Sequence, residues 1–297
     1  TGTLRHVERH WCSGEQILKK IPECSSHETD GLILYCFGRE SGLESTPDQT
    51  EDGRPLVIAY SDCEEQIREM ILEAAAAKRV LTDTPELERD GVARKEARHT
   101  AHKTEEYLKK YLSDIFTPGN FDVTWYANGR ARELKSSREL SYLISELCDK
   151  TYSKCPVIRN ELINRNYLSP AASRARRELM EAMIVSEGRE NLGMTGTGPE
   201  VAIYRTMLLA EKIHSLGKDG QWRFVVPKRG SSYSKAWDLI DKSVKKAKNE
   251  TIEVTRLMEA LREPPFGMKE GPIPVLICLF LIINSDELAL YQEDAFI

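Results

Sequence analysis

The sequence has none of the short motifs that mark the common catalytic chemistries. A nucleotide-binding phosphate loop needs Gly-x-x-x-x-Gly-Lys-Ser/Thr directly after a strand, and this pattern is absent. The patterns Gly-x-Ser-x-Gly and His-Glu-x-x-His and a pair of catalytic carboxylates are absent as well. The glycine-rich stretch 193–198 has no strand before it and no Lys-Ser/Thr after it, so it is interpreted as a flexible loop. We therefore predict no catalytic residue and no bound cofactor in this chain.

Histidines and cysteines are too scattered to indicate a metal centre. His6 and His10 are four residues apart and His99 and His102 are three apart. Neither pair has a third ligand nearby in the sequence, and a metal site needs three or four. The seven cysteines have irregular spacing and include no Cys-x-x-Cys pair. Their odd number and the lack of a signal peptide predict a reducing, cytoplasmic location.

The sequence also lacks an apolar run long enough to cross a bilayer. Its most apolar stretch is 273–283, whereas a membrane span needs roughly 20 apolar residues. The stretch is interpreted as a buried helix, and no membrane partner is expected. A hydrophobic content of 40% and a charged content of 30% are typical of a globular, helix-rich chain with two or three domains.

Charge is spread unevenly along the chain. The net charge is −5 over 297 residues, but it is −7 for 1–150, +7 for 151–250 and −5 for 251–297. Only the middle third can attract a polyanion such as nucleic acid. Function is therefore sought first in that third.

The middle third begins with the pattern of a helix-turn-helix. Pro156 is placed to open a first helix over 156–163, and Ser169-Pro170 is placed to cap and begin a second helix over 170–184. Basic residues near the start of the second helix complete the pattern of a helix that enters a DNA groove. These residues are Arg174, Arg176 and Arg177.

The N-terminal third predicts a small α/β edge followed by a helical hairpin. Continuous apolar runs at 32–37 and 55–60 are typical of strands covered on both faces. Two strands alone are only marginally stable, so the rest of the sheet is expected upstream, outside this chain. The other elements expected here are a helix over 4–21, a helical hairpin over 64–82 and 86–116, a β-hairpin turning at Asn128-Gly129, and a capped helix over 137–150.

The C-terminal half predicts two winged-helix-like modules. Expected helices lie at 200–215, 234–248, 251–261 and 273–283, and expected wing strands lie at 222–226, 287–291 and 295–297. The overall prediction is an α+β, mainly helical fold with an α/β edge, a helical hairpin and two winged-helix-like modules. The predicted domains are 1–127, 128–230 and 231–297.

The basic residues of the middle third are the candidate DNA contacts. Arg174, Arg176 and Arg177 can meet phosphates or base edges if their helix enters a major groove. A wing would bring Arg223, Lys228 and Arg229 to the DNA backbone, and the lysines at 242–248 would add phosphate contacts. The alternative is that these cations are solvated or pair with acidic surfaces of neighbouring domains. The second module has an apolar helix where a DNA reader needs polar residues, so it is interpreted as structural.

Three sequence segments, 156–165, 171–177 and 264–274, are similar to a region of very large bacterial proteins. The chain resembles the P-loop ATPases of BREX-type phage-resistance systems and related restriction-like proteins. The resemblance implies a parent that binds ATP and Mg²⁺ in another domain and acts with partner proteins against foreign DNA. No residue of this chain matches the family's nucleotide-binding motifs. Because the chain does not begin with Met and ends in an apparent strand, it is expected to be a piece of such a parent.

Three functions remain open at this point. The first is a non-catalytic, DNA-engaging winged-helix region of a large ATP-dependent phage-defence protein. The second is a protein–protein interaction scaffold within the same complex, without nucleic-acid contact. The third is a degenerate ATPase half that keeps the strands at 32–37 and 55–60 without a phosphate loop.

Overall fold

A computed structural model describes residues 2–13, 17, 20–26, 28–38, 47–247, 250–292 and 295–296. The fold is α+β and mainly helical, as predicted. Two compact units are present. The sheet unit is His6–Cys148, and the helical unit is Asp149–Ile297 together with Thr1–Arg5. The compact units divide after Cys148, whereas the sequence analysis placed domain boundaries after residues 127 and 230.

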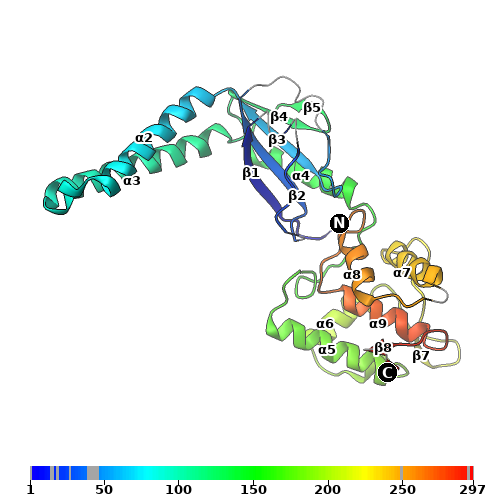
Figure 1. Ribbon diagram of the computed structural model, residues 1–297. Helices are drawn as coiled ribbons and strands as arrows, with labels where there is room; N and C mark the ends of the chain where they lie inside the picture. The colour runs from blue at the N-terminus through cyan, green and yellow to red at the C-terminus, as the bar shows by residue number, and fades with distance from the viewer. Residues whose placement is uncertain are drawn as a thin grey trace. The chain divides into compact units, whose positions relative to one another are not determined.

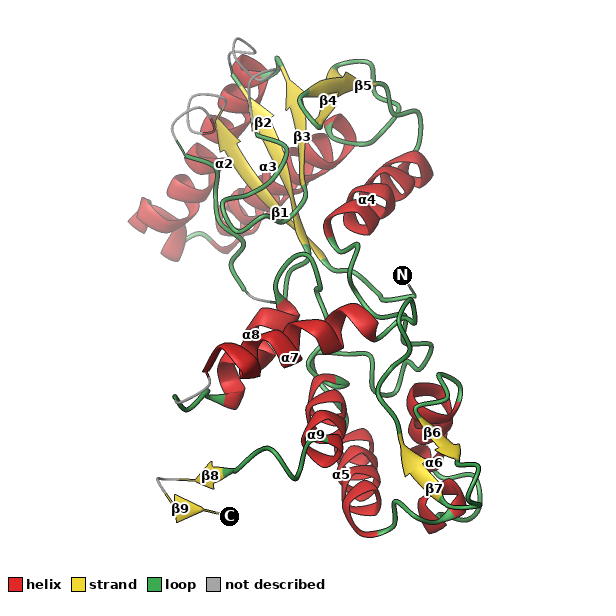
Figure 2. Ribbon diagram, turned by 90° about the vertical axis from the view of Figure 1, so that its right-hand side faces the viewer, coloured by secondary structure: helices red, strands yellow, loops and turns green. Residues whose placement is uncertain are grey.

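A five-stranded mixed sheet forms the centre of the sheet unit (Figure 2). Strands β1, β2 and β3 are parallel, and β4 and β5 are antiparallel to their neighbours. The strands at 32–37 and 55–60 and the hairpin around Asn128-Gly129 were predicted correctly. In spatial order the strands are β1 (Val7–Ser13), β2 (Gly31–Phe37), β3 (Leu56–Ser61), β4 (Val123–Ala127) and β5 (Arg130–Arg132).

Strand β1 overturns one sequence prediction. The helix expected over 4–21 is wrong, because Val7–Ser13 pairs along its whole length with β2. Trp11 stacks with Tyr35 and Phe116 on one face, while Cys12 enters the core on the other face. Residues 14–16 and 18–19 of that expected helix lie outside the described residues. The strands at 32–37 and 55–60 also have more partners within this chain than expected, since the sheet contains five strands from it.

Both faces of the sheet are covered by apolar side chains. Helix α4 (Ser137–Thr151) packs Leu140, Leu143 and Leu147 against the face that carries Trp125. The opposite face carries Leu34 and Ile58 and has its own core. Coverage on both faces explains why β2 and β3 are continuous apolar runs rather than alternating ones.

The sheet unit contains the predicted turn at Asn128-Gly129 and the predicted Ser136 cap. Asn128 and Gly129 adopt φ of 53° and 63°, the left-handed conformation that a two-residue type I′ turn requires. Half of the predicted capping box forms, because Glu139 N–H donates to Ser136 Oγ at 3.3 Å, whereas the Glu139 carboxylate accepts the N–H of Lys135, one residue before the cap, at 2.8 Å. Each of these two elements can therefore be read from its own residues.

A long helical arm is inserted between β3 and β4 and extends away from the sheet (Figure 1). It consists of α2 (Glu64–Asp83), the short helix η2 (Pro85–Glu88) and α3 (Gly91–Ile115). This is the predicted helical hairpin. Of the residues in α2 and α3, only Ile67 and Ile115, at the sheet end, are buried. The arm is therefore a solvent-exposed pair of helices.

The helical unit is built around one continuous core. One cluster of buried apolar residues extends from Ile158 to Phe280, so the two expected modules at 128–230 and 231–297 share a core. Within the described ranges, no helix has both the length and the hydropathy of a membrane span. The elements are α5 (Pro170–Val185), η3 (Glu190–Gly193), α6 (Pro199–Tyr204), the π-turn η4 (Arg205–Leu209), β6 (His214–Leu216), β7 (Trp222–Phe224), α7 (Ser234–Ala247), α8 (Val254–Arg262), α9 (Ile273–Ile283), β8 (Tyr291–Gln292) and β9 (Ala295–Phe296).

The first helix of the predicted helix-turn-helix does not form. Residues 156–163 are irregular and turn structure. Asn160 Oδ1 accepts Leu162 N–H at 3.0 Å, and Asn164 Nδ2 donates to Ile158 O at 3.1 Å. These side-chain amides satisfy the backbone locally and compete with helical hydrogen bonds.

The helix expected over 200–215 is shorter than predicted. It is α-helical only to Tyr204, continues as the π-turn η4, and is followed by Lys212 at a φ of 56° and by strand β6. The strand pair β6–β7 then forms an antiparallel hairpin. A helix followed by such a hairpin agrees with a wing, but the winged-helix assignment stays a prediction.

Candidate nucleic-acid interface

Helix α5 begins as the sequence predicts and presents two contrasting faces. Ser169 Oγ accepts the N–H of Ala172 at 3.2 Å, and Pro170 occupies the first turn. The face with Leu179 and Met183 is fully buried in the core. The remaining surface carries the three predicted arginines.

The structure assigns different environments to these arginines. Arg174 and Arg177 are exposed on 72% and 71% of their side-chain surfaces, and each lies beside a carboxylate one turn later. Arg174 Nε is 2.9 Å from Glu178 Oε1, and Arg177 Nε is 3.9 Å from Glu181 Oε1. Such exposed pairs are weak, at about 0.3–0.5 kcal/mol, so either guanidinium can be recruited by an anionic ligand.

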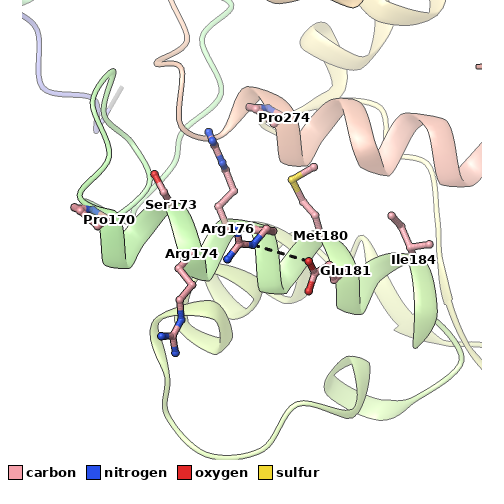
Figure 3. A pocket seen from close by; sticks show the side chains of 9 residues that line it. Pro170, Ser173, Arg174, Arg176, Met180, Glu181, Ile184 and Pro274 are labelled. Carbon is pink, nitrogen blue, oxygen red and sulfur yellow. Dashed lines mark ion pairs between the residues drawn. The ribbon is translucent and has the colours of Figure 1, made fainter. Parts of the chain in front are cut away.

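Arg176 has a structural contact instead. Its side chain is half-buried, and Nη1 donates to the carbonyl oxygen of Gly271 at 3.3 Å. The contact connects α5 to the segment that leads into α9. Figure 3 shows Arg176 and Arg174 pointing in different directions from α5. Arg176 is therefore less available to a ligand than Arg174 or Arg177.

A hollow of about 560 Å³ lies along this face of α5 where it meets the start of α9 (Figure 3). All three predicted arginines line it. The sequence analysis missed its apolar part, which is Met180 and Ile184 from α5 and Pro274 from α9. Its wall thus combines cations and apolar side chains with one carboxylate, Glu181.

The predicted wing cations do not line this hollow. Arg223, on β7, forms an ion pair with Asp219 across the hairpin turn. Lys228 and Arg229 follow β7 in an exposed loop, and their side chains have no partner in the described part of the chain. The structure therefore brings together the α5 arginines, while Lys228 and Arg229 lie outside the hollow and have no ion-pair partner in the described ranges.

The segment Arg205 to Ala247 has a net charge of +6 and holds further cations that the sequence analysis did not name as DNA contacts. Buried Trp237 and Ile240 turn the lysines of α7 toward solvent. A count of charge along the sequence can find this segment, although only the structure shows which cations are exposed. The exposed cations of this segment without a partner among the described residues are Arg205, Lys212, Lys218, Lys228, Arg229, Lys235, Lys242 and Lys246.

Buried His214, which the sequence analysis did not single out, holds the β6–β7 hairpin in place. Its Nε2 lies 2.8 Å from the carbonyl oxygen of Glu187, and its Nδ1 lies 2.8 Å from Tyr204 Oη. A carbonyl only accepts, so Nε2 carries the proton and Tyr204 donates to Nδ1. Burial lowers the pKa of His214 and keeps the ring neutral.

Glu187 completes this link between α5 and the hairpin. Its carboxylate Oε1 accepts the N–H of Phe224 at 2.8 Å, while its carbonyl accepts from His214. The His214 ring also packs against Trp222 and Phe224 of β7. The segment after α5 and the hairpin are therefore fixed to each other by one polar and aromatic cluster.

No group of three or more His, Cys, Asp or Glu side chains that could hold a metal ion occurs among the described residues. His10, which the sequence analysis considered together with His6, lies 2.6 Å from a Glu8 carboxylate oxygen. Comparison with known protein families, with curated proteins and with solved structures finds no match for this chain. The function is therefore argued from the surface itself.

Proposed function

We propose that the helical unit is a non-catalytic module that binds duplex DNA through its phosphates. The observation that carries the proposal is the set of exposed cations between Arg205 and Lys246 that have no partner among the residues the structure describes. In a phage-defence ATPase of the kind that the sequence resembles, such a module would hold DNA while ATP is used elsewhere in the parent. The nucleotide site, its ATP and its Mg²⁺ belong to the parent in this proposal.

The two units carry net charges of opposite sign, and the positive one is the helical unit, as DNA binding requires. The helical unit carries a net charge of +3, and the sheet unit carries −8. Lysines and arginines gain affinity for DNA by releasing the counterions condensed on its phosphates. Cations without a carboxylate partner contribute most, because they have no ion pair to give up. DNA is therefore expected on the helical unit and not on the sheet unit.

Helix α5 supplies the second part of the proposed surface. Arg174 and Arg177 have only weak partners, and a guanidinium can bind a phosphate or the O6 and N7 atoms of guanine in a bidentate manner. The His214 cluster fixes the hairpin relative to the end of α5. A rigid connection of this kind holds the two sets of cations at a constant spacing.

The test is a fluorescence-anisotropy titration of a labelled 20-base-pair duplex with the whole chain. The double variant Lys228→Ala/Arg229→Ala should lower the affinity at 50 mM salt and reduce the slope of log K against log salt by about 1.8, which is about 0.9 for each lost phosphate contact. The double variant Arg174→Ala/Arg177→Ala should act in the same direction. The matched control, Lys103→Ala/Lys110→Ala, removes two exposed lysines from the helical arm and should change neither quantity.

The DNA proposal fails if the chain shows no salt-dependent affinity for the duplex. It also fails if the arm control lowers affinity as much as the Lys228/Arg229 variant, because binding is then a property of any surface lysine. A preference for one base sequence would indicate that α5 contacts base edges as well as phosphates. Uniform binding to all sequences would restrict the contact to phosphates.

The hollow on α5 favours a second candidate function, a docking site for another protein. Ile184 and Val185 are exposed on 67% and 82% of their surfaces at the end of α5, next to the arginines. DNA phosphates gain nothing from apolar side chains, whereas an acidic, amphipathic protein segment uses both. We infer an acidic segment of another domain or subunit as the ligand of this hollow.

Selection from a random peptide library on the immobilised chain separates the two candidates. Docking predicts enriched peptides that combine Asp or Glu with large apolar residues and that lose binding when Ile184 is changed to Asp. The matched control is Val226→Asp, which places the same charge at an exposed apolar residue outside the hollow. Enrichment that is indifferent to Ile184→Asp contradicts the docking site and leaves the DNA proposal unaffected.

A further inference from the structure

Two buried cysteines face each other across neighbouring strands of the sheet unit. Cys12 on β1 is aligned with Cys36 on β2, and their Sγ atoms are 3.2 Å apart. Both residues are buried, at 5% and 0% exposure, in the same apolar face of the sheet. Nothing in the proposed function uses this pair.

The strand geometry allows a covalent bond between the two sulfur atoms. Neighbouring strands lie about 4.7–4.9 Å apart, which falls within the range of about 4.4–6.8 Å between the Cα atoms of disulfide-bonded cysteines. Aligned residues of parallel strands also project from the same face of the sheet. Bond formation therefore needs an approach of about 1 Å by the sulfur atoms, without a change of strand register.

The two thiols are chemically unequal. The hydrogen bond between them lowers the pKa of Cys12, while the same bond and burial raise the pKa of Cys36. The direction of these shifts favours Cys12 as the attacking thiol, since the thiolate is the reactive form, and its position on the edge strand favours it independently. Strand β1 lies at the edge of the sheet and pairs only with β2. Local opening of an edge strand gives a small oxidant access to Cys12.

We infer that Cys12 and Cys36 are a reversible dithiol–disulfide pair that responds to hydroperoxides. The Cys12 thiolate attacks one oxygen of the peroxide, the O–O bond breaks, and water or an alcohol leaves with the proton from the thiol. The Cys36 sulfur then attacks the Cys12 sulfenic acid, and the Cys36 thiol proton leaves with the hydroxide as water. Both sulfurs are oxidised, the peroxide is reduced by two electrons, and a dithiol restores the thiols by exchange.

The consequence is a covalent link between the edge strand and the centre of the sheet. A disulfide removes conformations from the unfolded chain and stabilises the unit that contains it. The disulfide should therefore raise the melting temperature of the sheet unit by about 5–10 °C and leave that of the helical unit unchanged. Dithiothreitol should reverse the shift.

Peptide mapping of the whole chain tests the proposal without any variant. After treatment with hydrogen peroxide and alkylation of the remaining thiols, digestion without reduction should release a linked Cys12–Cys36 peptide. Trypsin alone leaves Cys24 and Cys36 on one peptide, so Asp-N is added to cut before Asp30 and separate them. A linked Cys12–Cys24 peptide, or alkylated Cys12 and Cys36 after oxidation, overturns the inference.

Variants then test the order of the two steps. In Cys36→Ser, the Cys12 sulfenic acid has no partner to attack it and should be labelled by dimedone, while Cys12→Ser should leave Cys36 unlabelled. Cys278→Ser removes a buried cysteine of the helical unit and should form the Cys12–Cys36 disulfide as the unaltered chain does. Equal dimedone labelling of Cys12 and Cys36 in the two single variants would overturn the assignment of Cys12 as the attacking thiol.

Discussion

Helices α3 and α9 are stabilised in opposite ways. Helix α3 spans 25 residues and buries only Ile115, whereas α9 spans 11 residues and buries seven of them. The first is held by its packing along α2 and by local contacts, which include the Asp90 cap and the ion pair of Lys109 with Glu105. The second depends on the core of the helical unit. The length of a helix in this chain therefore does not indicate how much it contributes to the free energy of unfolding.

The strongest way to test this contrast is to truncate one apolar side chain in each helix. Leu279→Ala in α9, at 0% exposure, should destabilise the helical unit by about 2–5 kcal/mol through lost burial and a cavity. Val92→Ala in α3, at 82% exposure, should change stability by less than about 0.5 kcal/mol. Urea unfolding monitored by circular dichroism measures both. Equal losses would contradict the comparison.

The second prediction concerns glycines near the starts of the same helices. A Cβ atom at Gly271, before α9, would lie 1.9 Å from the carbonyl oxygen of Ile163, so Gly271→Ala should cost about 1–3 kcal/mol. A Cβ atom at Gly91, at the start of α3, meets nothing within 4 Å. Gly91→Ala should stabilise the arm slightly, since alanine restricts the unfolded chain. Thermal melts of the two variants should therefore shift in opposite directions.

The third prediction is a loss of stability between pH 7.5 and 5 that belongs to the helical unit. Because the folded pKa of His214 is lowered, the unfolded chain binds a proton more readily than the folded one below about pH 6.5. Stability should then fall with decreasing pH, by at most about 1.4 kcal/mol per unit, until the folded pKa is reached. Urea midpoints between pH 7.5 and 5 measure the slope. His214→Gln should abolish the contribution of His214 to the pH dependence of stability. An unchanged slope in that variant would mean that another group causes the loss of stability.

The most local expected loss of stability is at the N-terminal cap of α3. Asp90 Oδ1 accepts the N–H groups of Val92 and Ala93 at 3.0 Å each, so Asp90→Ala should cost about 1 kcal/mol of local stability. Hydrogen exchange should show faster exchange in the first turns of α3 and no change in the sheet. Slower folding or a lower melting temperature of the whole sheet unit would mean that the arm is coupled to the core after all.

The elements that the sequence predicted well are those that depend on nearby residues. The strands at 32–37 and 55–60, the type I′ turn at Asn128-Gly129, the start of α5 at Ser169 and the arm all follow from runs, caps and turns within a few positions. Strand β1 was misread as a helix because its partner, β2, begins 24 residues after it. Its apolar residues also fit a helical period, and only pairing decides between the two.

The exposed cations of the candidate site could be predicted from the sequence, but the contact of Arg176 and the apolar part of the hollow could not. The charge of the middle third indicated Arg174, Arg177, Lys228 and Arg229, which are all exposed. The sequence could not show that Arg176 is engaged by the carbonyl of a residue 95 positions away. The apolar part of the hollow was also hidden, because Pro274 reaches it through the packing of α9 on α5.

The salt dependence of duplex binding tests the central claim most directly. For the unaltered chain we expect log K to fall linearly with log salt, and for Lys228→Ala/Arg229→Ala we expect a slope smaller by about 1.8. The arm control Lys103→Ala/Lys110→Ala should keep the full slope. A slope that is the same in all three proteins would contradict the assignment of DNA binding to the helical unit.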